Sequence, residues 1–299
     1  MNGNWQDIEL SLSYAKNQTI SFIKKEPITG GCINQTWKVT DNYGEKYFLK
    51  TNIPSLENMF VVEANSLIEI EQSNSIRTPH VLVYGSNYDY SYLVLEYITL
   101  EPQINQQYMG IQLAHMHKST NPLKESAKQF GWVKNNFIGS TPQSNKPHKH
   151  WASFWKNERL LYQLNLAKTN GYSSKAYDEG LKLAESVKLF FSNYQPEPSL
   201  LHGDLWDGNC ASDLNGKPVI YDPALYYGDR ETDIAMTELF GGFDHDFYKT
   251  YNSFYTLDSD YKTRKNLYNL YHILNHYNLF GGGYAAQAEN MTKRLLSEV

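Results

Sequence analysis

The sequence of 299 residues has few of the features that mark secreted or membrane-bound proteins. Its two cysteines, Cys32 and Cys210, are too few and too far apart to indicate the disulfide framework of a small secreted domain. No apolar run is long enough to cross a bilayer, and the start of the chain carries Asp7 and Glu9 where a signal peptide would be positively charged. We therefore expect a cytoplasmic protein with no membrane partner.

The chain also lacks an excess of positive charge. Lysine and arginine number 27 against 32 aspartate and glutamate residues, which gives a net charge of -5. A surface that binds nucleic acid needs basic residues to neutralise phosphates, so nucleic acid is not an expected partner. The composition, 41% hydrophobic and 20% charged, is that of a globular protein. The length allows two lobes with a cleft between them.

The first hundred or so residues show the pattern of a small sheet with helices. The spacing of Trp5, Ile8 and Leu12 predicts a short opening helix. β-prone segments follow, and a hairpin signal over 41–44 joins two of them. Asn52 and Pro54 predict the start of a helix. The predicted strands cover 20–23, 35–40, 46–50, 81–84 and 92–97.

Beyond residue 102 the pattern becomes helical. We expect the stretch 200–222 to be the only interruption of these helices by loop and strand. We place the lobe boundary near Ile98 to Pro102, with a nucleotide-binding lobe over 1–98 and a helical lobe over 99–299 that holds the catalytic loop and the acceptor site. The predicted helices cover 104–119, 152–169, 175–193, 231–240, 245–254, 260–279 and 285–297.

The stretch 200–223 has the residue types and spacing of a phosphotransferase centre. Asp204 and Asn209 lie on one short loop, and Asp222 ends the apolar strand that follows. A hydroxyl acceptor needs a carboxylate that takes its proton, and ATP needs oxygen ligands for Mg²⁺. Asp204 is the candidate base, and Asn209 and Asp222 are the candidate Mg²⁺ ligands. An ordinary turn before a strand is the alternative, but it does not require a second acid at the end of the next strand.

Three segments of the N-terminal part are candidates for nucleotide binding. Gly30, Gly31 and Cys32 lie in a turn between predicted strands, where backbone amides could approach phosphates, although a simple β-turn is the more frequent meaning of a Gly-Gly pair. Lys50 ends a predicted strand and Glu63 lies on the next helix, the order expected for a phosphate-binding ammonium and its orienting carboxylate. The backbone of Glu96 to Ile98 could pair with an adenine edge.

Motifs over nearly the whole chain resemble one protein family, the fructosamine kinases or ketosamine-3-kinases, within the group of aminoglycoside- and choline-kinase-like enzymes. Trp206 in the catalytic loop and the Phe-Gly-Gly-Phe segment distinguish this family from other small-molecule kinases. The matching segments are Gly30-Gly31-Cys32-Ile33-Asn34, Phe48-Leu49-Lys50, Phe130-Gly131-Trp132, Ile138-Gly139-Ser140-Thr141-Pro142-Gln143, Trp151-Ala152-Ser153-Phe154, His202-Gly203-Asp204-Leu205-Trp206, Asp222-Pro223-Ala224, Tyr227-Gly228-Asp229-Arg230-Glu231-Thr232-Asp233 and Leu239-Phe240-Gly241-Gly242-Phe243.

The resemblance implies an α+β, protein-kinase-like fold of two lobes, with a small antiparallel sheet in the N-terminal lobe and a mainly helical C-terminal lobe. It implies ATP-dependent phosphorylation of a sugar hydroxyl on a ketosamine, a small molecule or a protein-bound one, whose unstable 3-phosphate then releases the amine. Carried over by position, Asp204 is the base, Asn209 and Asp222 hold Mg²⁺, and Lys50 with Glu63 serves the nucleotide. We expect ribulosamine- or erythrulosamine-type acceptors to be preferred over fructosamines.

Two other functions remain open. The catalytic loop alone does not separate a ketosamine kinase from a kinase of a free small alcohol such as choline or an aminosugar. A nucleotide-binding pseudoenzyme is the alternative from another class, but a binding module has no use for a base together with two metal ligands.

Several other residues have structural and functional interpretations. Asp233 is expected to hold the catalytic loop through backbone amides, and His202 to maintain the fold of that loop. His272 and His276 could line an acceptor pocket or be core and surface residues. Cys32 is either a redox-sensitive thiol or a small buried residue, so we expect a monomer or a redox-dependent homodimer through Cys32.

Overall fold

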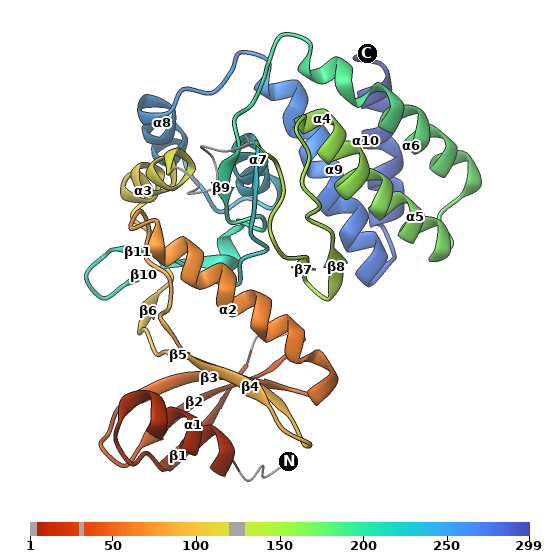
Figure 1. Ribbon diagram of the computed structural model, residues 1–299. Helices are drawn as coiled ribbons and strands as arrows, with labels where there is room; N and C mark the ends of the chain where they lie inside the picture. The colour runs from red at the N-terminus through yellow and green to blue at the C-terminus, as the bar shows by residue number, and fades with distance from the viewer. Residues whose placement is uncertain (1–4, 30–32, 120–128) are drawn as a thin grey trace. The chain divides into compact units, whose positions relative to one another are not determined.

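The structure is a computed structural model that describes residues 5–29, 33–119 and 129–299. The chain forms two compact units, drawn in Figure 1. The first is Met1–Ile104 with Ala211–Tyr221, and the second is Asn105–Cys210 with Asp222–Val299. The units differ from the expected lobes in two places: residues 99–104 and the short segment 211–221 both belong with the N-terminal residues. The strand of the segment 211–221 pairs with residues 100–101, so backbone hydrogen bonds hold it there.

The first unit contains an antiparallel five-stranded sheet in the order β1-β2-β3-β5-β4. A turn over Asp41–Glu45 joins β2 to β3, which confirms the predicted hairpin. The first strand begins two residues later and runs further than the sequence pattern predicts. The elements of this unit are α1 (Gln6–Lys16), β1 (Phe22–Ile28), β2 (Gln35–Asp41), β3 (Lys46–Asn52), η1 (Pro54–Leu56), α2 (Glu57–Gln72), β4 (Val81–Ser86), β5 (Ser91–Glu96), β6 (Leu100–Glu101), β10 (Cys210–Asp213) and β11 (Pro218–Ile220).

Each face of this sheet is covered by one helix. Successive side chains of a strand point to opposite faces. On β5, Tyr92 and Val94 therefore pack in the cluster that contains the apolar face of α1, whereas Leu93 and Leu95 pack with α2. The same alternation places Leu49 of β3 toward α1 and its neighbour Lys50 on the face that α2 covers. The fold of the unit therefore determines which helix can supply a partner to Lys50.

The second unit is mainly helical. Helix α9 is its central helix: its residues 267–275 are all buried, and it contacts α5, α7 and α10 (Figure 1). None of the helices in the described residues is long and apolar enough to span a membrane. The helices are α3 (Gln106–Lys118), α4 (Trp151–Phe154), a π-helical segment η2 (Trp155–Leu160), α5 (Leu161–Thr169), α6 (Ser174–Ser186), η3 (Val187–Phe191), η4 (Asp207–Asn209), α7 (Glu231–Leu239), α8 (His245–Phe254), α9 (Tyr261–Phe280) and α10 (Tyr284–Leu296).

The expectation that only 200–222 interrupts the helices is wrong. Strands β7 (Asn136–Ile138) and β8 (Thr141–Gln143) form a hairpin, and β12 (Tyr226–Gly228) pairs with β9 (Ser199–Leu201). Strands of three residues are too short to show a period of two, and Pro142 argues against a strand. Side-chain hydrogen bonds from Asn136 and Gln143 to other segments hold the hairpin in place.

Candidate active site

The loop after β9 carries Asp204, and the buried carboxylate of Asp233 holds the backbone of this loop by hydrogen bonds. The backbone N–H groups of His202 and Gly203 donate to the two carboxylate oxygens of Asp233 at 2.8 and 2.9 Å. Gly203 has φ +83°, and a Cβ atom there would lie 2.1 Å from the carbonyl oxygen of Ala224. Only glycine fits this position. The prediction that Asp233 holds the loop through backbone amides is confirmed.

Two buried histidines complete this support. His117 Nε2 lies 3.1 Å from Asp233 Oδ2, and His117 Nδ1 lies 2.7 Å from the hydroxyl of Tyr251. Burial would raise the pKa of Asp233, but the hydrogen bond and charge of His117 help to hold it below its ordinary value. His202 Nδ1 accepts from the backbone N–H of Asp204 at 3.2 Å, which confirms its predicted part in the loop fold.

The side chain of Asp204 is 22% exposed, so solvent reaches part of its carboxylate. Burial, followed by the charges of Asp222 and Asp233, raises its pKa to about 7. The amide Nδ2 of Asn209 donates to the main-chain oxygen of Asp204 at 2.8 Å and lies 3.4 Å from its Oδ2. The loop therefore brings a partly exposed carboxylate and an amide side chain together, as the spacing of the sequence predicts.

Asp222 lies just past the end of β11, with φ +56°, in the left-handed region that few residues adopt. The two residues after Pro223 form hydrogen bonds with the catalytic loop and with the β7–β8 hairpin. The N–H of Ala224 donates to the carbonyl of His202 at 2.9 Å, and the carbonyls of Ala224 and Leu225 accept from Gln143 and Asn136 at 3.1 and 2.7 Å.

The hairpin that supplies these amides was not assigned a role from the sequence. Gln143 also accepts from the hydroxyl of Tyr271 at 2.6 Å, and Arg159 donates to Asn145 at 2.7 Å. All four side chains are buried. A dense run of Asn and Gln beside Pro142 is the only local signal, and it indicates a loop as readily as a support for Asp222.

The residues around Asp204 fit a magnesium ion. Because Nδ2 of Asn209 is engaged, its Oδ1 is the atom that would bind a cation. Burial, followed by the negative charges of Asp222 and Asp233, raises the pKa of Asp204, and a bound divalent cation would offset the repulsion among the three carboxylates. The described residues contain no cluster of three or more His, Cys, Asp and Glu side chains able to hold a metal by themselves. Two protein oxygens suit Mg²⁺, which keeps water and phosphate ligands.

Lys50 and Glu63 meet within the first unit. Lys50 Nζ lies 2.6 Å from Glu63 Oε1, and both side chains are largely buried. The pairing follows from the alternation on β3, which directs Lys50 toward α2. The structure therefore brings together the two residues that the sequence analysis pairs.

The other candidates for nucleotide binding are Gly30, Gly31, Cys32 and the segment from Glu96 to Ile98. Gly30, Gly31 and Cys32 lie outside the described residues. The backbone N–H of Glu96 donates to the main-chain oxygen of His80 at 2.9 Å. The carboxylate oxygen Oε1 of Glu96 lies 2.6 Å from Nη2 of Arg77. Ile98 follows the end of β5 and is half-buried.

An aromatic cluster lies beside the catalytic loop. The ring of Trp206, 37% exposed, contacts Phe240 edge-on, and Phe240 contacts His276. His276 also contacts the rings of Phe280 and Tyr284. His276 of α9 therefore belongs to this aromatic cluster, and Nδ1 of His272 lies 3.9 Å from Oδ1 of Asp204.

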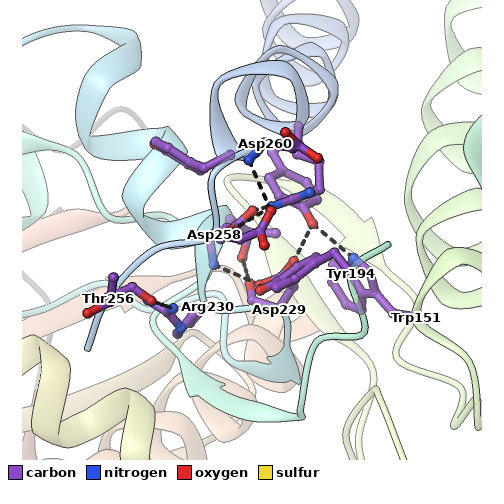
Figure 2. Close-up of polar contacts among 12 residues, drawn as sticks. Trp151, Tyr194, Asp229, Arg230, Thr256, Asp258 and Asp260 are labelled. Atoms are coloured by element: carbon purple, nitrogen blue, oxygen red, sulfur yellow. Dashed lines mark hydrogen bonds and ion pairs between the residues drawn. The ribbon is translucent and has the colours of Figure 1, made fainter. Parts of the chain in front are cut away.

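Figure 2 shows a polar network around Asp229 and Arg230, the two residues that directly follow β12. Asp229 accepts from the hydroxyls of Tyr194 and Tyr268 and from the N–H of Glu231. Arg264 donates to both carboxylate oxygens of Glu231, at 2.8 and 3.0 Å. Asp229, Glu231, Arg264 and Tyr268 are buried, and the network anchors the start of α7, the helix that carries Asp233.

Comparison with known proteins agrees with this geometry. The sequence profile of the fructosamine kinase family matches residues 4–298. A Vibrio cholerae protein named as a probable ketoamine kinase is 40% identical over 98% of this chain and 99% of its own. The chloroplastic protein-ribulosamine 3-kinase of Arabidopsis thaliana is 40% identical over 87% of this chain and 79% of its own.

Solved structures show the same fold. The crystal structure of a Haemophilus somnus protein with the provisional name fructosamine-3-kinase superposes with a TM-score of 0.88, at 29% identity, over 98% of this chain and 97% of its own. The aminoglycoside phosphotransferase APH(2'')-Ib, at 13% identity and a TM-score of 0.62, shares the fold alone, over 95% of this chain and 98% of its own. The chain therefore has an α+β, protein-kinase-like fold, belongs to the fructosamine kinase family, and is a kinase of ketosamines.

Proposed function

We propose that this kinase transfers the γ-phosphoryl group of ATP to the 3-hydroxyl of a ketosamine, with Asp204 as the base. The hydroxyl oxygen forms the new bond to phosphorus, the bond from phosphorus to the β-phosphate oxygen breaks, ADP leaves, and the hydroxyl proton passes to Asp204. The observation that supports this role is the placement of the partly exposed Asp204 on a loop whose backbone is held by Asp233. Positioning supplies much of the rate enhancement in phosphoryl transfer.

The metal and nucleotide roles are part of the same proposal. Asn209 and Asp222 would hold Mg²⁺, which when bound neutralises charge on the phosphates. Lys50, oriented by Glu63, would bind the α- and β-phosphates. Gly30, Gly31 and Cys32 would contact phosphates through the glycine turn, and the backbone of Glu96 and Ile98 would bind adenine. The phosphate- and adenine-binding roles belong to a nucleotide-binding lobe over 1–98, whereas the metal ligands, the catalytic loop and the acceptor site belong to the helical lobe over 99–299.

For the acceptor we propose ribulosamine- or erythrulosamine-type ketosamines, on free or protein-bound amines, in the repair of glycated amines. The name of the Arabidopsis thaliana relative, a protein-ribulosamine 3-kinase, supports this choice. We propose the cytoplasm as the place of action, since the chain has only two cysteines and Cys210 is buried.

A panel of acceptors tests the proposed function. ATP and Mg²⁺ are offered with ribulose-lysine, fructose-lysine, choline and an aminoglycoside in parallel, and ADP release is measured. We expect the highest kcat/KM on ribulose-lysine. Turnover of choline or the aminoglycoside alone would favour the kinase of a free alcohol, and no turnover of any acceptor would favour the pseudoenzyme.

Asp204→Asn is the matched variant for this assay. It should retain affinity for the magnesium nucleotide, since Asn keeps the size of the side chain, but lose most of kcat because the proton acceptor is gone. Wild-type kcat in this variant would show that Asp204 is not the base.

A further inference from the structure

His272 differs from the other histidines near the catalytic loop in its hydrogen bonding. His117 bonds to Asp233 and Tyr251, His202 accepts from Asp204, and Nδ1 of His276 donates to the main-chain oxygen of His272. In the part of the chain that the structure describes, no group forms a hydrogen bond with the ring nitrogens of His272. The ring nitrogens of His272 are therefore available for a hydrogen bond with a ligand in the site.

The position of His272 shows where such a ligand would lie. Its side chain is 5% exposed, and its Nδ1 lies 3.9 Å from Oδ1 of Asp204. That distance is too long for a hydrogen bond between the two groups. Both groups therefore keep the capacity to bind separate atoms of one small molecule. The ring of Tyr271 packs edge-on against the His272 imidazole, with 5.1 Å between the ring centroids, and helps to fix its orientation.

The protonation of His272 sets the kind of hydrogen bond that it can make. Burial, followed by the charge of His276, lowers its pKa to about 3, although Asp233 acts in the opposite direction. The imidazole is then neutral, with one N–H donor. Nδ1 is the nitrogen that faces the carboxyl oxygen of Asp204, and a hydrogen on Nδ1 directs its positive end toward that oxygen, so the Nδ1–H tautomer is favoured. His272 thus presents a donor beside the base.

We propose that His272 determines acceptor specificity by donating a hydrogen bond from Nδ1 to the C2 ketone oxygen, next to the C3 hydroxyl that donates to Asp204. The inference rests on the proposed function. A ketosamine carries these two oxygens on adjacent carbons, so it can contact both residues at once. Choline has no oxygen next to its hydroxyl, and it leaves the His272 donor unpaired. The pair of residues thereby selects α-hydroxy ketones.

The experiment compares two acceptors and three proteins. The acceptors are ribulose-lysine and its 2-deoxy analogue, in which a methylene group replaces the ketone. For the wild type we expect a kcat/KM about 10- to 100-fold higher on ribulose-lysine, because the analogue leaves a buried donor unpaired. His272→Ala should lower kcat/KM on ribulose-lysine by a similar factor and leave the analogue within about threefold of wild type. His272→Asn, which places an amide donor near Nδ1, should restore part of the preference.

The ratio of kcat/KM values for the two acceptors does not depend on the fraction of protein that is folded. It therefore separates a specific contact from damage to the helix. Affinity for the magnesium nucleotide should be the same in all three proteins. An unchanged acceptor ratio in His272→Ala, whether both rates fall or neither does, overturns the inference while leaving the proposed function in place. A wild type that phosphorylates choline or an aminoglycoside but not ribulose-lysine overturns the proposed function and the inference with it.

Discussion

At the scale of single residues, the active site places negative charges close together before any ligand binds. The carboxylate of Asp204 is near Asp222 and Asp233, and burial adds to the cost of ionising it. Its pKa is raised to about 7 in the folded protein, whereas an aspartate in the unfolded chain ionises near pH 4. This group therefore favours folding most at acid pH, and its contribution to the free energy of unfolding is lost as the pH rises toward 7.

This account predicts that Asp204→Asn changes the free energy of unfolding in a pH-dependent way when the protein is kept metal-free with EDTA. Asp204→Asn should raise the free energy of unfolding more at pH 8 than at pH 5, by about 2 kcal/mol, because the wild type holds a costly charge only at the higher pH. Denaturant melts at the two pH values measure this difference. Asp178→Asn, on the exposed face of α6, is the control for loss of a surface charge. The same gain at both pH values would contradict the electrostatic account.

At the scale of elements, the β7–β8 hairpin acts on the segment that carries Asp222. Its two amide side chains bind the carbonyls of Ala224 and Leu225, so the hairpin restrains the chain just after the proposed metal ligand. A main chain with φ +56° at Asp222 is unfavourable for an isolated residue and persists because neighbouring contacts hold it. The hairpin is therefore a positioning element for Asp222.

This role predicts two separable effects of Gln143→Leu. The change leaves the carbonyl of Ala224 and the hydroxyl of Tyr271 without their amide partner, which should cost about 1–3 kcal/mol of stability. It should also weaken binding of the magnesium nucleotide several-fold, as measured by calorimetry, because Asp222 loses a restraint.

Gln163→Leu is the matched control for that change. This buried amide bonds to Asn275 and Asn278 and forms no hydrogen bond with residues 222–226, all of which the structure describes. It is linked to the hairpin only indirectly, because Asn275 donates to the carbonyl of Ile138 and not to the segment that follows Asp222. It should lose stability to a similar extent but bind the nucleotide as the wild type does. Equal nucleotide affinity in both variants would leave the hairpin a purely structural role.

At the scale of the whole molecule, the prediction concerns an oxidative disulfide between two copies of the chain. Cys32 lies outside the described residues, so the predicted redox switch stays a prediction. Cys210 is 4% exposed, and burial raises the pKa of its thiol to about 12. A buried thiol that is difficult to ionise reacts slowly with oxidants. Any disulfide between chains is therefore expected at Cys32.

Mild peroxide tests this expectation. The wild type and Cys210→Ala should form a dimer on a non-reducing gel and lose activity, and both effects should reverse with dithiothreitol. Cys32→Ala should remain monomeric and active. A dimer or the same loss of activity in Cys32→Ala would remove Cys32 from the mechanism.

The sequence by itself determined the elements with long periodic patterns and the order of the reactive residues. The helices around Leu12 and along α9, the hairpin over 41–44 and the loop from Asp204 to Asn209 are local features, because hydrophobic spacing and turn residues are encoded within a few positions. The pairing of Lys50 with Glu63 was also within reach. Strand alternation and helix order both place the two residues on one face.

Only the tertiary structure decided which segments hold the site in place. The hydrogen bond of Gln143 with Ala224 and the approach of His272 to Asp204 join residues far apart in the chain, and no local pattern encodes such a distance. The same reason explains why the β7–β8 hairpin and the pairing of β10 with β6 were not foreseen. Their strands are too short to carry a period, and they are stabilised by partners that folding alone brings near.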